Sequence, residues 1–149
     1  MQRRAIDLAS YTMNSEGKLS TTNTWENMPM AQAEVCCFDN IVLNPAGTML
    51  AVSGGDGLQF FKFNGANPMT PLSGSTITGT LGSLFPMAWD KANHLYALNS
   101  RSGRLHIWTI TDKDAVEVSG SPFTVPFCGY LGPPIDAAAC TQTLIGRSL

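Results

Sequence analysis

Short runs of apolar residues alternate with polar turns along most of the chain. In the sequence, the segment Ile41–Val52 aligns with the segment Met87–Leu98 at an offset of 46 residues without a gap. Each segment reads as two short strands joined by a turn. Gly47 and Asn93 fall at the same place in that turn, and both residue types tolerate a left-handed backbone. Because one strand–turn–strand pattern recurs at a fixed period, we expect two copies of a repeated β unit.

A third strand follows each segment after a five-residue turn. It covers Leu58–Phe63 in the first unit and Leu105–Ile110 in the second, now at an offset of 47, and Leu8–Met13 is similar to both. In the two later copies bulky apolar residues occupy both alternating faces, so we expect strands that are buried on both sides. A polar turn and a short fourth strand follow each copy.

Four short antiparallel strands in each unit predict an all-β fold of β-propeller blades. We expect the end of a preceding blade in residues 1–28, blades in 36–80 and 84–125, and a tail in 126–149 with a closing strand. A β-sandwich is the alternative all-β fold, but it does not predict recurrence at a fixed period. Closed propellers have about 4–8 blades, so two complete blades with partial ones do not close a ring. We expect the missing blades in further sequence of the same protein or in other copies of the chain.

Composition excludes some classes of function. The chain has 149 residues, of which 9 are Lys or Arg and 11 are Asp or Glu, and its net charge is −2. Such a balance does not suit a nucleic-acid-binding protein. The uncharged stretches 63–89 and 118–135 are interrupted by Gly, Pro and Asn, which argues against a membrane span. No apolar block follows the basic N-terminus, so we expect no signal peptide in this chain.

The four cysteines do not predict a metal site. They form no C-x-x-C pair, and neither histidine lies at zinc-ligand spacing from them, so we expect no metal and no cofactor. Cys128 and Cys140 flank the loop 129–139, and a disulfide between them is one alternative. That disulfide would imply an oxidising compartment. A periplasmic or extracellular location is the favoured interpretation.

Three segments resemble blades of the lactonase-like seven-bladed propellers, the 6-phosphogluconolactonase and muconate-cycloisomerase-like superfamily. They are Leu43–Val52, Leu105–Ile110 and Ser119–Val125, which contains the Gly-Ser-Pro-Phe ending of a blade. The resemblance covers roughly residues 6–125. It implies that the chain corresponds to the C-terminal part of a longer protein that hydrolyses or isomerises a small lactone, such as a sugar-acid lactone. The fragment alone would then be inactive.

Two alternatives to that function stay open. A WD-repeat scaffold is one, because Leu105–Trp108 also resembles the third strand of that family. Against it, the Gly-His pair is absent, and the only Trp-Asp pair, Trp89-Asp90, stands at the end of a first strand. The other is a non-catalytic, secreted or periplasmic propeller that acts as a binding or interaction module, since the fold alone does not decide the function.

The lactonase resemblance implies a cleft at one end of the channel, where loops bring Arg, His and carboxylates to a small anionic ligand. Arg101, His94 and Asp56 are the candidates in this chain. An Arg would hold a carboxylate or phosphate, and a His would guide water to the lactone carbonyl. For each candidate the alternative is an ordinary solvated turn residue, Asp56-Gly57 being a common turn dipeptide.

Two further polar residues have structural interpretations. His106 lies inside a third strand, so we expect a hydrogen-bonded histidine that packs against aromatic rings. Asp90 aligns with Asn44 at the end of a first strand, where an Asp or Asn caps the following turn.

Overall fold

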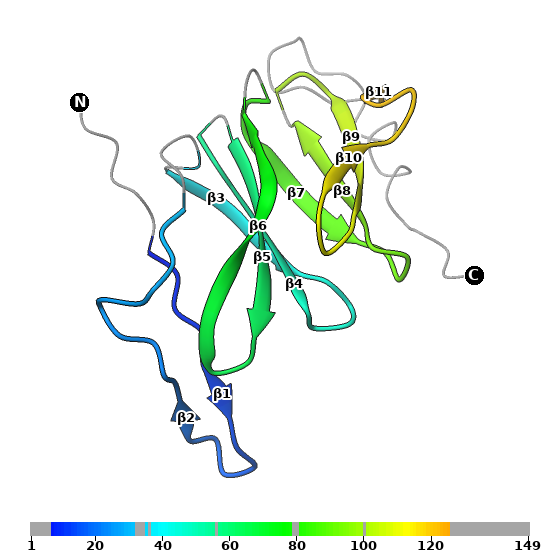
Figure 1. Ribbon diagram of the computed structural model, residues 1–149. Coiled ribbons are helices and arrows are strands. Elements are labelled where there is room, and N and C mark those ends of the chain that lie inside the picture. The colour runs from blue at the N-terminus through cyan, green and yellow to red at the C-terminus, as the bar shows by residue number, and fades with distance from the viewer. Residues whose placement is uncertain are drawn as a thin grey trace, which may run out of the picture.

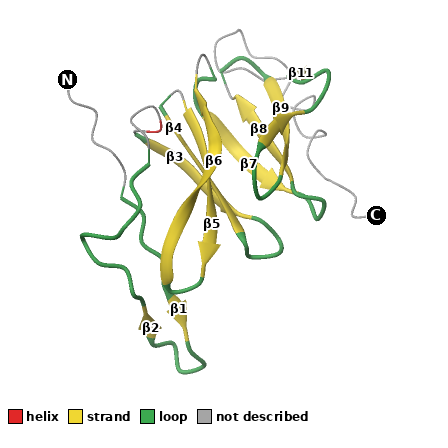
Figure 2. Ribbon diagram, in the orientation of Figure 1, coloured by secondary structure: helices red, strands yellow, loops and turns green. Residues whose placement is uncertain are grey.

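A computed structural model describes residues 7–31, 35, 37–55, 57–78, 81–99 and 101–125. In these residues the regular elements are strands and no α-helix is present, which confirms the all-β prediction (Figures 1 and 2). Asp56, the cysteines Cys128 and Cys140 and the expected closing strand lie outside the described residues. The strands are β1 (Thr12–Met13), β2 (Leu19–Ser20), β3 (Phe38–Leu43), β4 (Met49–Gly54), β5 (Gly57–Asn64), β6 (Asn67–Thr78), β7 (Leu84–Trp89), β8 (His94–Asn99), β9 (Arg104–Ile110), β10 (Ala115–Glu117) and β11 (Phe123–Thr124).

Two antiparallel sheets contain most of these strands. The first sheet has the order β3-β4-β5-β6, and the second has the order β7-β8-β9-β10, with β11 also paired to β9. β10 and β11 share the fourth position, because β10 pairs with the end of β9 and β11 with its beginning. Between them the Ser121 hydroxyl accepts a hydrogen bond from the Ile107 amide at 3.0 Å. The expected four-stranded antiparallel units are thus confirmed, and the fourth strand of the second is interrupted.

Backbone hydrogen bonds fix which positions of the two sheets are equivalent. The Phe63 amide donates to the Thr48 carbonyl, and the Ile110 amide donates to the Asn93 carbonyl. Phe63 therefore corresponds to Ile110, at the expected offset of 47. The residue that precedes the second strand is Thr48 in the first sheet and Asn93 in the second, so the second strands themselves align at an offset of 45. The ungapped alignment of the second strands was wrong, because the turn before β8 is one residue shorter than the turn before β4.

The turns between first and second strands contain the expected left-handed residues. The φ angles of Gly47 and Asn93 are 70° and 61°. Their amides donate to the carbonyls of Asn44 and Asp90, respectively. The prediction from the residue types is confirmed at both positions.

The two sheets pack against each other through one apolar core. We call it the inter-sheet core; it comprises Met49, Ala51, Leu58, Phe60, Leu72, Leu84, Met87, Leu95, Ala97, Trp108 and Ile110. The first strands, β3 and β7, contact each other. The Trp89 indole N–H donates to the Val42 carbonyl at 3.2 Å, and the Ser53 hydroxyl donates to the Leu84 carbonyl at 3.1 Å. These polar contacts fix the alignment of one sheet on the other.

The N-terminal segment, residues 7–31 and 35, covers the other face of the first sheet. Here Leu8, Ala31 and Val35 pack on apolar residues of that sheet, namely Leu50, Val52, Phe61 and Met69. The segment is also tied to the turn between β5 and β6, where the Ser10 hydroxyl donates to the Asn67 carbonyl at 2.8 Å and the Asn23 amide side chain donates to the Ala66 carbonyl at 2.9 Å. The first sheet is therefore covered on both faces.

Each sheet receives the preceding part of the chain on the same face. Leu50 and Phe61, which face the N-terminal segment, correspond to Leu95 and Trp108, which face the first sheet. Figure 1 shows the resulting order: N-terminal segment, first sheet, second sheet. Sheets that pack face to face in chain order, each with the same face toward the preceding one, are expected of neighbouring propeller blades. The described residues form two such units and not a closed ring.

The opposite face of the second sheet lies at the surface within the described part of the chain. We call it the outer face; its side chains are those of His94, Tyr96, Leu98, Leu105, Ile107, Thr109, Val116 and Phe123. All six residues of β4 are buried, whereas buried and half-buried residues alternate along β8. Burial on both sides was thus correctly expected for β5 and wrong for β9, because no described segment covers the outer face.

Candidate functional site

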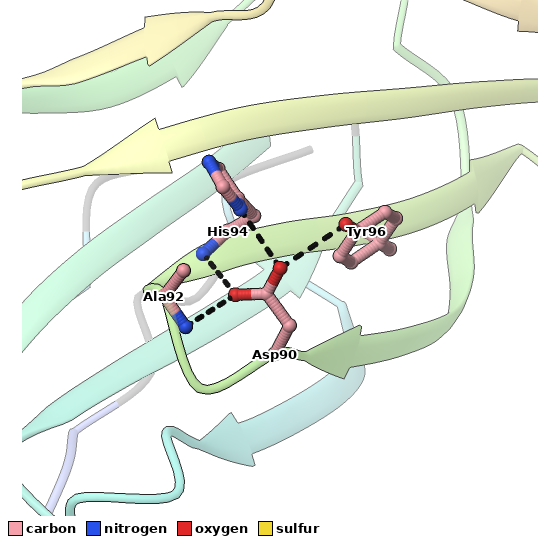
Figure 3. A network of polar contacts seen from close by, with 4 residues as sticks. All are labelled: Asp90, Ala92, His94 and Tyr96. Carbon is pink, nitrogen blue, oxygen red and sulfur yellow. Dashed lines mark hydrogen bonds and ion pairs between the residues drawn. The ribbon is translucent and has the colours of Figure 1, made fainter. Parts of the chain in front are cut away.

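A polar network occupies the turn that joins β7 to β8 (Figure 3). One carboxylate oxygen of Asp90, Oδ1, accepts hydrogen bonds from the backbone amides of Ala92 at 2.8 Å and His94 at 2.9 Å. The other, Oδ2, accepts from the His94 ring at Nδ1 (2.8 Å) and from the Tyr96 hydroxyl (3.1 Å). One carboxylate thus closes the turn and also orients two side chains.

The corresponding turn of the first sheet closes without a histidine or a tyrosine. Asn44 Oδ1 accepts from the backbone amides of Thr48 and Met49, as Asp90 does in the second sheet. The positions of His94 and Tyr96 are occupied there by Met49 and Ala51, which belong to the inter-sheet core. The predicted capping role of Asp90 is confirmed. Because Asn44 caps its turn alone, the histidine and the tyrosine are not requirements of the turn.

The network also shifts two acid–base equilibria. Burial alone would raise the pKa of Asp90, but the hydrogen bonds from the His94 amide and ring, the Ala92 amide and the Tyr96 hydroxyl outweigh it and hold that pKa below its ordinary value. Burial, the hydrogen bond to Asp90 and the negative charge of that carboxylate raise the pKa of Tyr96. Asp90 is therefore ionised and Tyr96 neutral at neutral pH.

The geometry makes His94 suitable for proton transfer. When Nδ1–H donates to the Asp90 carboxylate, the other ring nitrogen, Nε2, carries the lone pair of the neutral imidazole. The His94 side chain is 34% exposed and stands on the outer face, at the start of β8. A carboxylate that fixes the tautomer of a solvent-accessible imidazole is the arrangement of a general base.

The other candidates do not join His94. Arg101 is exposed in the turn that follows β8, where its amide donates to Asn99 Oδ1 at 2.9 Å. His94 begins β8 and Arg101 follows its other end, so the two residues lie about 16 Å apart or more at the usual rise of about 3.3 Å per residue. Asp56, the third candidate, is not among the described residues. The cation nearest to His94 in sequence is Lys91, which lies in the same turn.

A second polar cluster surrounds His106. The ring donates from Nδ1 to Glu117 Oε1 at 2.9 Å and stacks on Trp108, with ring centroids 5.3 Å apart. The Ser121 hydroxyl donates to the same Glu117 oxygen at 2.7 Å. The expectation of a hydrogen-bonded histidine on an aromatic ring is confirmed. The carboxylate stands between serine and histidine, so this cluster lacks the serine–histidine contact of a nucleophilic triad.

Sequence reasoning identified His94 but not Tyr96 as part of the site. The signal was present as the spacing Asp90-x-x-x-His94-x-Tyr96, because residues 94 and 96 lie on one face of a strand and Asp90 folds back over the turn. Nothing in the sequence separated this pattern from a surface turn.

Comparison of the chain with known protein families and with curated proteins finds no match. Among the described residues no group of three or more His, Cys, Asp or Glu side chains could hold a metal ion. The described residues also include no helix of the length and apolar character that crossing a membrane requires.

Proposed function

We propose that the chain belongs to a lactonase-like propeller and that Asp90 and His94 act as a catalytic dyad in the hydrolysis of a small lactone, with His94 as the general base. The observation that carries the proposal is the 2.8 Å contact between His94 Nδ1 and Asp90 Oδ2, on a histidine that its turn does not require. The resemblance of three blade segments to that family supplies the substrate class.

In this proposal His94 Nε2 removes a proton from a water molecule as the oxygen attacks the lactone carbonyl carbon. The ring C–O bond then breaks, and the imidazolium returns the proton to the leaving alkoxide, which yields a hydroxy acid. Asp90 holds the imidazole orientation and stabilises its positive charge, the usual part of a carboxylate behind a catalytic histidine. Lys91 is the candidate to attract an anionic substrate, in place of the distant Arg101.

Both groups lie in one turn of this chain, so the proposal departs from the expectation of an inactive fragment and predicts turnover by the chain itself. The test compares two histidines that each contact a carboxylate. In a pH-stat assay with a six-membered sugar-acid lactone, His94→Gln should lower the enzyme-dependent rate by about 10²-fold or more. His106→Gln, the matched control, should leave that rate within about twofold. Wild-type protein that hydrolyses the lactone no faster than buffer, or a His94→Gln variant that keeps the wild-type rate, would overturn the proposal.

A non-catalytic interaction module is the second candidate, favoured by the apolar outer face of the second sheet. It predicts association without any lactone turnover, so the same assay separates the two functions.

A further inference from the structure

The Tyr96 hydroxyl and the His94 ring share one acceptor. Both donate to Asp90 Oδ2, His94 from Nδ1 at 2.8 Å and Tyr96 from its hydroxyl at 3.1 Å, as Figure 3 shows. The other oxygen, Oδ1, accepts from the backbone amides of Ala92 and His94. Those two bonds hold the carboxylate and close the turn, so neither task requires the tyrosine.

The turn of the first sheet uses the second arm of its cap differently. Asn44 Oδ1 closes that turn, and the Asn44 side-chain amide donates across the sheets to Asn93 Oδ1 at 2.9 Å. The residue at the position of Tyr96 is Ala51, which belongs to the inter-sheet core. The second arm of the Asp90 cap serves two side chains of β8 instead. This convergence on one oxygen distinguishes the second sheet from the first.

The contact between Tyr96 and Asp90 has a fixed direction. Burial, the hydrogen bond to Asp90 and the negative charge of that carboxylate raise the pKa of Tyr96, and the pKa of Asp90 is lowered. At neutral pH the hydroxyl therefore donates and the carboxylate only accepts. A donor that stabilises the charge of a carboxylate oxygen leaves less of that charge for a second donor. The Tyr96 hydroxyl thus competes with His94 for Oδ2.

We propose that Tyr96 is a positioning residue that tunes His94 through Asp90. By taking up part of the charge on Oδ2, the hydroxyl weakens the hold of the carboxylate on the imidazolium. His94 then stays a neutral proton acceptor at a lower pH than Asp90 alone would allow. The catalytic use of this effect rests on the proposed function of His94 as a general base, whereas the effect on the ring itself does not require turnover.

The other groups around His94 carry no charge or lie in exposed turns. On the outer face His94 pairs with Thr109, which pairs in turn with Val116, and neither side chain titrates in the accessible range. The first sheet, which contains Lys62, packs on the opposite face. Apart from Asp90, the charged side chains of the two turns at this end of the second sheet are exposed, namely Lys91, Asp112, Lys113 and Asp114. A change confined to the Tyr96 hydroxyl leaves all of them in place.

The test is Tyr96→Phe, which removes the hydroxyl and keeps the ring. In nitrogen-15 spectra of the full chain without substrate, the His94 ring signals are identified by their absence from His94→Gln. In Tyr96→Phe these signals should titrate at a pH higher than in the wild type by about 0.5 to 1. In the lactone assay the low-pH limb of the pH–rate profile should move in the same direction, while the plateau rate stays within about threefold.

A second background shows whether the tyrosine acts through the carboxylate. Asp90→Asn places at this turn the residue type that caps the first turn at Asn44. In that background Tyr96→Phe should no longer move the His94 titration. Tyr11→Phe, the matched control, makes the same substitution at an exposed tyrosine of the N-terminal segment and should leave both readouts unchanged. Circular dichroism verifies folding, and Tyr96→Met, which also lacks the hydroxyl, replaces Tyr96→Phe if that variant unfolds.

Each outcome decides one of the two proposals. A His94 titration that is unchanged or moves to lower pH in Tyr96→Phe would overturn the tuning role. So would an equal movement in the Asp90→Asn background, since the hydroxyl would then act without the carboxylate. Wild-type protein that hydrolyses no lactone, but whose His94 signals move as expected in Tyr96→Phe, would defeat only the proposed function.

Discussion

The two sheets share one pattern of strands and turns, yet they differ in how much of that pattern is buried. The first sheet lies between the N-terminal segment and the second sheet, and every residue of β4 is buried. Within the described residues the second sheet is covered on one face, and its outer face presents Tyr96, Ile107 and Val116 toward the surface. Alternating apolar residues thus specify that a face can be buried, while the neighbouring element decides whether it is.

The largest expected effect comes from truncating equivalent side chains on the two sheets. Phe60→Ala should lower the free energy of unfolding by roughly 3–5 kcal/mol, because it leaves a cavity in the inter-sheet core. Ile107→Ala, at the equivalent position of the outer face, should cost only about 1 kcal/mol, since that side chain is half-buried. Urea unfolding of dilute protein, followed by circular dichroism, measures both. Equal losses would contradict the difference between the two faces.

The next effect concerns the polar link between the turns of the two sheets. Asn44 is 3% exposed, and its side-chain amide donates to Asn93 Oδ1 at 2.9 Å. Asn44→Ala should cost about 2 kcal/mol, because it leaves buried backbone amides without an acceptor. Asn40→Ala, in the strand β3 that precedes Asn44, removes only a bond to the adjacent Ile41 amide and should change stability by less than about 0.5 kcal/mol. If urea unfolding gives both variants a similar loss in the free energy of unfolding, the polar contacts of Asn44 do not stabilise the fold.

The pH dependence of stability should also distinguish the two turns, because the cap of the second turn, Asp90, is titratable and the cap of the first, Asn44, is not. The pKa of Asp90 is lowered in the folded state, so the folded protein binds that proton less tightly than the unfolded chain does. The resulting stabilisation is fully present above the ordinary pKa near 3.8 and is lost as the pH falls through the lowered pKa. Asp90→Asn should therefore weaken the fall in stability between about pH 5 and pH 2.

The control for this titration is Asp112→Asn, which removes an exposed carboxylate from the turn between β9 and β10. Unfolding midpoints in urea at each pH give the comparison. A pH profile of Asp90→Asn that coincides with that of the wild type would contradict a lowered pKa.

The smallest expected effect tests the left-handed residues. Gly47 has a φ of +70°, and a Cβ atom there would meet no neighbour within 4 Å. Gly47→Ala should therefore cost about 1 kcal/mol from backbone strain alone. Gly47→Asn, the residue type that the second sheet uses at Asn93, should cost clearly less. Thermal unfolding of both variants measures the two losses of stability. A larger loss for Gly47→Asn than for Gly47→Ala would contradict the prediction.

Much of the fold could be predicted from the sequence because local chemistry fixes it. The paired apolar strands, the left-handed residues at Gly47 and Asn93 and the cap at Asp90 all follow from residue type and spacing. The one-residue difference between the turns was missed, because the identity of Ala51 and Ala97 favours an ungapped alignment. Only backbone hydrogen bonding distinguishes the two alignments.

The candidate site was less predictable. His94 was identified, but its partners depend on how Asp90 folds back across the turn and on the alternation that places Tyr96 beside it. Arg101 looked equally suitable in sequence, yet it follows the opposite end of β8. Burial of β9 on both sides was expected from its composition, and it failed because burial depends on a neighbour that the strand itself does not encode.

The most direct test of the stacking of the two sheets is the pattern of nuclear Overhauser effects in dilute, monomeric protein. The Phe60 and Trp89 rings lie with centroids 6.1 Å apart in an edge-to-face arrangement across the two sheets. The account predicts cross-peaks between the Phe60 ring protons and the Trp89 indole protons, and none between Ile107 and residues of the first sheet. Cross-peaks from Ile107 to the first sheet, with none from Phe60 to Trp89, would contradict it.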